Sequence, residues 1–337
     1  MAEYRKTEAR EWAREKMRGV ANVIIPTFTQ DLRDVNEAAT RHDVRKEIEY
    51  GFWGTLLVSE TATTFDEYRR FSEWAVDEAR GRLHLIHHAS WNTLEESIRA
   101  AQVAEATGVD LILLSYPPTF YPQSQEEIFE YTKAYCDATN LGVILFPVPL
   151  WGFERLHPAG IAPETIARMV REIPNIVAIK SEGGMPTIAG FVENYKRFSN
   201  EVIVTFPMED QALMLASLVS MPFMGTSNYE YYGPMIPRIF TLIQEGRFEE
   251  AMKLYWQIHP ARLVNQQQNV IPGANFIHRM LWKYQGWLNG FNGGPLRAPT
   301  MRLNGNQMRA LRQGLVAAGL QPTNDGDDLF FEGRNPA

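Results

Sequence analysis

A lysine directly follows a short apolar segment near the middle of the chain. The segment is Ile176–Ile179, it ends at Lys180, and Gly183 follows three residues later. A continuous apolar run that stops at a turn is typical of a strand buried on both faces. Burial disfavours the charged ammonium, so the pKa of such a lysine falls and its neutral amine can form a Schiff base with a carbonyl. The alternative is a lysine whose head group extends to solvent.

Polar and aromatic residues end the other apolar runs as well. They are Thr27, Ser59, Glu60, His88, Ser90, Ser115, Tyr116, Phe146, Thr205, Phe206, Thr226, Ser227 and Asn228. Lys180 is the only lysine in this set. A single amine among hydroxyls and aromatic rings suits a neutral nucleophile better than a phosphate site, which needs several cations or glycine-rich helix starts.

Eight apolar runs alternate with helical patterns and must position these residues. We expect strands over residues 21–27, 54–58, 83–88, 110–115, 142–148, 175–180, 202–206 and 222–227. Repeated βα units predict parallel strands, and eight of them close a (β/α)8 TIM barrel, with its active site at the carboxyl ends of the strands. An open doubly wound α/β sheet is the alternative, but no Gly-x-Gly-x-x-Gly follows the first strand.

The chain divides into four predicted parts. Residues 1–20 form a charged N-terminal surface helix, and residues 21–235 form the barrel. Residues 236–322 form additional C-terminal helices, over 237–244, 247–258, 277–290 and 305–318, packed on the barrel. Residues 323–337 form a polar, acidic tail that we expect to be partly disordered.

Composition narrows the classes of partner. The 337-residue chain has a net charge of −7 and no basic run, which argues against nucleic acid and anionic membranes. The N-terminus is charged and no stretch of 18 apolar residues occurs, so we expect neither a signal peptide nor a membrane span. Cys136 is the single cysteine, so no internal disulfide is possible. We expect a soluble cytoplasmic protein with no cofactor and no metal.

Segments at three places in the chain resemble the Schiff-base lyase superfamily of dihydrodipicolinate synthase and N-acetylneuraminate lyase, which are class I aldolases. Residues 176–180 resemble the lysine segment of that family's sixth strand. Residues 59–63, Ser-Glu-Thr-Ala-Thr, lie where the family has a Gly-Glu-x-x-Thr turn. Residues 296–299, Leu-Arg-Ala-Pro, and residues 317–320 resemble its C-terminal helical segment. The long ends and residues 282–295 resemble the hydratase-aldolase branch, which cleaves aromatic benzylidenepyruvates.

The resemblance implies that Lys180 forms an imine with a 2-oxo acid. The imine allows aldol cleavage or addition, hydration or dehydration. It also implies a homotetramer built from dimers. The segment around Tyr121 resembles the one that lends a tyrosine to a neighbouring subunit.

Two departures from the family bear on the chemistry. The family ends its fifth strand with a tyrosine that relays protons, and this chain has Phe146 there. The family binds the substrate carboxylate with paired hydroxyl residues, where this chain has Leu57 and Val58. Both the proton relay and the carboxylate site must therefore be built from other residues.

We expect Lys180 as the nucleophile, with Tyr121 and Glu60 as catalytic acid–base candidates. The expected substrate contacts are Ser59, Phe146, His88, Tyr116, Trp151, Thr205, Ser227 and Asn228. The tyrosines could instead be packing residues and Glu60 a structural carboxylate. The sequence favours a lyase for a bulky or aromatic 2-oxo acid. The alternatives are a diverged barrel that performs decarboxylation or condensation, and a non-catalytic binding protein.

Overall fold

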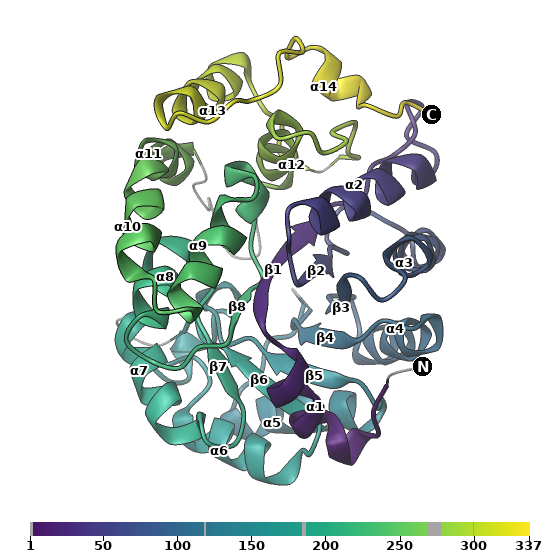
Figure 1. Ribbon diagram of the computed structural model, residues 1–337. Helices are drawn as coiled ribbons and strands as arrows, with labels where there is room; N and C mark the ends of the chain where they lie inside the picture. The colour runs from purple at the N-terminus through teal and green to yellow at the C-terminus, as the bar shows by residue number, and fades with distance from the viewer. Residues whose placement is uncertain (1–2, 118, 184–186, 269–277, 299) are drawn as a thin grey trace.

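The computed structural model describes residues 3–117, 119–183, 187–268, 278–298 and 300–337. Ile277, the first residue of the helix predicted over 277–290, and Pro299, the last of the segment 296–299, lie outside the described residues. Eight parallel strands surround one core, with helices outside them (Figure 1). The strands are β1 Gly19–Ile24, β2 Gly54–Leu57, β3 His84–Ala89, β4 Leu111–Leu114, β5 Gly142–Leu145, β6 Ile176–Lys180, β7 Ile203–Thr205 and β8 Phe223–Gly225. The predicted (β/α)8 barrel is confirmed.

The strand order is β7-β6-β5-β4-β3-β2-β1-β8, so the sheet closes where β7 meets β8. A side chain links the two strands there, because the Thr205 hydroxyl donates a hydrogen bond of 2.7 Å to the Phe223 carbonyl. On the other side of β8, Gly225 pairs with Ala21 of β1. A Cβ on Gly225, whose φ is +156°, would lie 2.7 Å from the Ala21 carbonyl oxygen, so glycine permits this close approach.

Helices connect successive strands and cover the outside of the barrel. They are α2 Glu37–Glu49, α3 Phe65–Ala79, α4 Leu94–Thr107, α5 Gln125–Asp137, α6 Pro163–Glu172, α7 Thr187–Phe198 and α8 Glu209–Ala216. Thr64, Thr93 and Ser124 cap α3, α4 and α5, each accepting a hydrogen bond from a backbone amide of the first turn. Short 3-10 helices are η1 Lys6–Glu8, η2 Pro149–Trp151, η3 Phe153–Arg155 and η4 Tyr229–Tyr232.

The N-terminal helix α1, Ala9–Lys16, packs against the barrel. Trp12 is buried and its ring contacts Tyr4 and His84. Arg10 donates a 2.8 Å hydrogen bond to the Ile176 carbonyl at the start of β6. The helix therefore covers the amino ends of the strands with an apolar side, while most of its charged side chains are exposed.

The C-terminal helices lie together beside the barrel (Figure 1). They are α9 Met235–Gln244, α10 Phe248–Gln257, α11 His259–Gln268, α12 Arg279–Leu288, α13 Gly305–Ala317 and α14 Leu329–Glu332. Helix α11 was not predicted. Lys283 fixes α12 to the carboxyl end of β1, because its ammonium donates to the carbonyls of Ile25 and Pro26, at 3.1 and 3.2 Å, and to the Thr27 hydroxyl.

The tail packs on this helical layer. Phe330 of α14 is fully buried, and the Arg334 amide donates to the Asn292 carbonyl at 2.9 Å. The expectation of a partly disordered tail is therefore wrong, because an aromatic side chain anchors it. Among the described residues, no helix combines the length and the apolar character that crossing a membrane requires.

Two buried carboxyl groups lie between the barrel and the helices outside β1. Asn22 of β1 donates to Glu47 of α2 at 2.6 Å and accepts from the backbone amide of Glu230 at 3.3 Å. One carboxyl oxygen of each glutamate has no hydrogen-bond partner among the described residues. Burial raises the pKa of Glu47 well above its usual value and that of Glu230 from 4.5 to about 8. Glu230 therefore holds its proton in the folded protein near neutral pH.

We predict that the Glu230→Gln substitution flattens the pH dependence of stability. Between pH 4.5 and about 8 only the folded chain keeps this proton. The free energy of unfolding should therefore fall by up to about 1.4 kcal/mol per pH unit as pH rises in this range. Urea unfolding at several pH values measures the slope. The control is Glu249→Gln, at an exposed position of α10, which should keep the wild-type slope. A slope in the Glu230→Gln variant equal to that of the wild type would contradict the prediction.

Candidate active site

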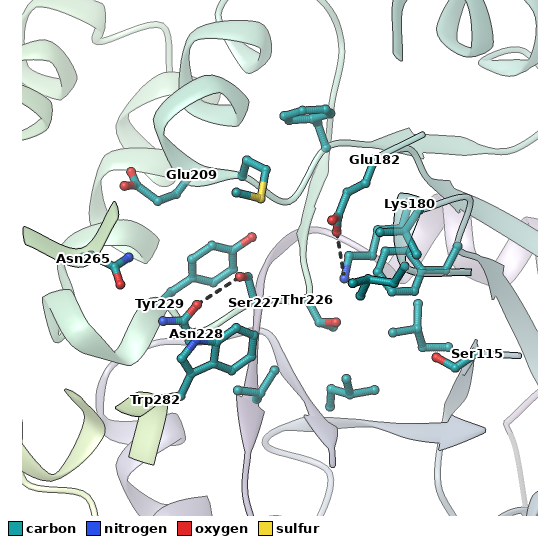
Figure 2. A pocket seen from close by; sticks show the side chains of 18 of the residues that line it. Ser115, Lys180, Glu182, Glu209, Thr226, Ser227, Asn228, Tyr229, Asn265 and Trp282 are labelled. Atoms are coloured by element: carbon teal, nitrogen blue, oxygen red, sulfur yellow. Dashed lines mark hydrogen bonds and ion pairs between the residues drawn. The ribbon is translucent and has the colours of Figure 1, made fainter. Parts of the chain in front are cut away.

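A cavity of about 400 Å³ opens at the carboxyl ends of the strands. Figure 2 shows Lys180 and Glu182 pointing toward each other at one end, with Glu209 and Asn265 at the opposite end. Its apolar lining includes Val23, Leu56, Leu113, Phe146, Trp151, Phe206, Met208 and Trp282. Its polar lining includes Glu60, His88, Ser115, Lys180, Glu182, Thr226, Ser227, Asn228 and Arg279. Mostly apolar walls with a few convergent polar groups are typical of a small-molecule site.

Lys180 is the last residue of β6 and its side chain enters the cavity. The residue is only 5% exposed. Its ammonium nitrogen lies 3.3 Å from Glu182 Oε1 and 3.8 Å from the centre of the Phe146 ring. Burial lowers the pKa of Lys180, and the nearby Glu182 carboxylate opposes this effect without overcoming it. The amine is therefore easier to deprotonate than an exposed lysine.

Glu182 was not among the predicted site residues. It follows Lys180 by two positions, and alternate residues of an extended segment lie on the same face. The sequence therefore contained a signal for it. Its carboxylate is the acidic group closest to the Lys180 nitrogen among the described contacts.

Glu60, which follows β2, lies in a second charged cluster on the wall of the cavity. Its carboxylate forms an ion pair with Arg279 and accepts a 3.3 Å hydrogen bond from Ser90. Burial acts to raise the pKa of Glu60, but the contacts with His88, Arg279 and Ser90 outweigh burial and the pKa lies below its usual value. Glu60 is therefore an anion near neutral pH. Arg279, at the start of α12, was missed because its position depends on a helix distant in sequence.

His88 of β3 completes this cluster. Its Nε2 lies 2.8 Å from the Ser115 hydroxyl and 3.7 Å from Glu60 Oε1. Burial lowers the pKa of His88 to about 4, so the imidazole is neutral near pH 7. A neutral imidazole can still hydrogen-bond to a substrate.

Four of the predicted site residues do not line the cavity. Tyr121 is 69% exposed, and the Arg155 guanidinium stacks on its ring. The Tyr116 hydroxyl lies 2.6 Å from the Thr132 hydroxyl inside the wall. The Ser59 hydroxyl donates to the His88 carbonyl. The Thr205 hydroxyl donates to the Phe223 carbonyl, between β7 and β8. The other predicted contacts, Phe146, His88, Trp151, Ser227 and Asn228, do line the cavity.

A hydrogen-bonded chain of amides connects the loop after β8 to the C-terminal helices. Asn228 donates to Gln285 of α12 at 2.8 Å, and Gln285 donates to Asn265 of α11 at 2.7 Å. At the same end of the cavity, Arg262 forms a two-point ion pair with Glu209, at 2.7 and 3.0 Å. The C-terminal helices thus form one wall of the site.

We predict that His88 keeps one protonation state between pH 5.5 and 8, because burial holds its pKa near 4. The imidazole signals of histidine-labelled protein, with His88 assigned through a His88→Gln variant, measure this by NMR. The His88 signal should stay constant across the range. A titration midpoint near 6.5 would contradict the described burial.

Comparisons with known proteins agree with this geometry. The model of the dihydrodipicolinate synthetase family matches residues 16–313. The 4-hydroxy-tetrahydrodipicolinate synthase of Methanopyrus kandleri is 25% identical over 314 residues, which cover 91% of this chain and 98% of that protein.

Solved structures share the fold at lower identity. Dihydrodipicolinate synthase from Aquifex aeolicus has a TM-score of 0.76 at 20% identity, covering 91% of this chain and 100% of that one. N-acetylneuraminate lyase from Fusobacterium nucleatum has a TM-score of 0.73 at 17% identity, covering 89% and 98%. The predicted resemblance to this superfamily is confirmed, and the chain belongs to the dihydrodipicolinate synthetase family, a family of lyases of the class I aldolase type.

Proposed function

We propose that the protein is a lyase that acts on a 2-oxo acid through an imine on Lys180. One observation carries the proposal. A buried lysine whose pKa is lowered enters a cavity of about 400 Å³ at the carboxyl ends of the barrel strands. A neutral amine in such a cavity is the nucleophile that condensation with a ketone requires.

The imine forms in two steps, and both need proton transfer. The amine of Lys180 attacks the keto carbon to give a carbinolamine, which then loses water. Glu182, at 3.3 Å from the Lys180 nitrogen, is in position to move the proton of the attacking amine to the alkoxide oxygen, and then to deliver a second proton, taken from solvent, to the departing hydroxyl. The resulting iminium accepts electrons from the neighbouring carbons, so a carbon–carbon or carbon–oxygen bond there can break or form.

Phe146 replaces the family tyrosine and has a different part in this scheme. Its ring face lies 3.8 Å from the Lys180 nitrogen, and the indole N–H of Trp151 donates to its backbone carbonyl at 2.7 Å. An aromatic face stabilises a nearby cation. Phe146 therefore stabilises the iminium, while the carboxylate of Glu182 takes over the proton transfer.

The shape of the cavity supports a bulky or aromatic substrate. Its walls carry the rings of Phe146, Trp151, Phe206 and Trp282. Glu209 and Asn265 line the end of the cavity opposite Lys180, so the cavity extends beyond the imine carbon (Figure 2). A benzylidenepyruvate, which carries a phenyl ring beyond the keto acid, suits this arrangement.

A second candidate is a condensing enzyme of the same family. It is favoured by the name of the Methanopyrus kandleri relative, 4-hydroxy-tetrahydrodipicolinate synthase. The same imine on Lys180 serves either direction of an aldol reaction, so the site accommodates both.

We further propose that the protein is a homotetramer in the cytoplasm. Tyr121 supports this arrangement, because it is 69% exposed and lies in the segment that resembles a subunit contact of the family. A tyrosine outside its own cavity is available to a neighbouring subunit.

Borohydride trapping should place a 2-oxo acid on Lys180. Pyruvate condenses with the amine to give an imine and water, and hydride from borohydride reduces the imine to a stable secondary amine. We expect the adduct on the peptide that contains Lys180, found by mass spectrometry. The Lys180→Ala variant should carry none, and the exposed-lysine control Lys253→Ala should be labelled like the wild type. No adduct with pyruvate or aromatic 2-oxo acids would support the non-catalytic alternative.

Product analysis should separate the two candidate reactions. With benzylidenepyruvate and water, we expect benzaldehyde and pyruvate in equal amounts, with Lys180→Ala as the blank. Formation of 4-hydroxy-tetrahydrodipicolinate in its own assay, without benzaldehyde release, would contradict the proposal of a bulky aromatic substrate and favour condensation.

A further inference from the structure

The proposed substrate carries a carboxylate, and the pair of hydroxyl residues with which the family binds that carboxylate is replaced in this chain. Leu57 and Val58 occupy the positions of the family's hydroxyl pair, and both side chains are buried and apolar. A carboxylate that enters a mostly apolar cavity needs a cation or several hydrogen-bond donors.

Three described cations line the cavity, namely Lys180, Arg262 and Arg279. Lys180 is consumed as the nucleophile. Arg262 is fully engaged, because two of its nitrogens contact Glu209 and the third donates to the Tyr255 carbonyl at 3.3 Å. Lys283 lies nearby but donates to three oxygens of the residues directly after β1, and it does not line the cavity.

Arg279 differs from these cations because its hydrogen bonds are incomplete. Its Nη2 donates to Glu60, whereas its buried Nε has no partner among the described residues and no described hydrogen bond involves Nη1. The guanidinium carbon lies 4.7 Å from the centre of the Trp282 ring, which holds it against the wall. A buried guanidinium with unused N–H donors is a pre-formed binding site for an anion, which accepts those hydrogen bonds.

Arg279 also lines the same cavity as the reacting amine. The charges of Arg279 and Glu60 both act on the pKa of Lys180. In a 2-oxo acid the carboxylate is bonded to the keto carbon, so the group that binds it must lie beside the lysine.

We propose that Arg279 binds the carboxylate of the 2-oxo acid. In the empty cavity the Arg279 guanidinium is instead ion-paired with Glu60. This inference rests on the proposed imine chemistry of Lys180. It makes Arg279 the residue that selects 2-oxo acids over neutral carbonyl compounds. Glu60 competes with the substrate for the same cation and keeps it paired in the empty cavity.

The test compares pyruvate with pyruvamide, which has the same ketone but no charge. Borohydride trapping at increasing ligand concentration gives the half-saturating concentration of each. We expect Arg279→Met to raise this concentration for pyruvate by roughly 10- to 100-fold, as the loss of a charge-assisted contact predicts, and to leave pyruvamide within about twofold. Arg279→Lys should restore part of the pyruvate affinity, and the exposed Arg309→Met variant should match the wild type.

Two further variants guard against a folding artefact. Arg279→Met leaves the Glu60 charge buried without its partner, which is destabilising. The double variant Glu60→Gln/Arg279→Met removes both charges and should show the same selective loss of pyruvate. The single variant Glu60→Gln should lower the half-saturating concentration of pyruvate, because the competing carboxylate is gone.

The outcomes separate this inference from the function on which it rests. If the wild type traps neither pyruvate nor pyruvamide, the imine chemistry itself is wrong. If the wild type traps both and the Arg279→Met and double variants retain wild-type half-saturation by pyruvate, the Arg279 site is wrong while the lyase proposal stands. Equal weakening of both ligands would also overturn the inference, because it indicates general damage to the cavity.

Discussion

The free-energy cost of burying one amine at the carboxyl end of a barrel is the constraint on which this site depends. Lys180 is 5% exposed, and removal from water disfavours its charged form. The Glu182 carboxylate at 3.3 Å offsets part of that cost, and the face of the Phe146 ring, 3.8 Å from the nitrogen, is also favourable to a cation. Neither neighbour cancels the effect of burial, so the nitrogen keeps a lowered pKa and remains available as a nucleophile.

The fold supplies this environment through contacts that lie far from the chemistry. The Thr205 hydroxyl joins β7 to β8, so the strand beside β6 has a partner on both sides. Lys283 attaches α12 to the residues after β1, and this attachment holds Arg279 at the cavity wall in an ion pair with Glu60. The C-terminal helices therefore contribute to the site as well as to the packing of the barrel. A charged cluster and an amine in one apolar cavity are the elements that imine chemistry on an anionic ketone requires.

The sequence predicted the parts of the site that depend on local pattern. An apolar run ending in a lysine, repeated βα spacing and strand-end position were sufficient to identify the barrel and to place Lys180, Phe146, Ser227 and Asn228 at the cavity. Side-chain direction was not predictable in the same way. The hydroxyl of Tyr116 turns to Thr132, a choice made by three-dimensional neighbours. Likewise, Arg279 reaches Glu60 across 219 positions of sequence, and only the docking of α12 brings them together.

The proposed chemistry depends on the lowered pKa of Lys180 inside the cavity. Its direct test is the titration of the wild-type protein labelled with ¹³C at the lysine ε-carbons, with the Lys180 signal assigned as the one that a Lys180→Ala variant lacks. We predict a titration midpoint clearly below the ordinary lysine value of about 10.4. A midpoint at or above that value would show that the ion pair with Glu182 outweighs burial, and would contradict a nucleophile whose pKa is lowered.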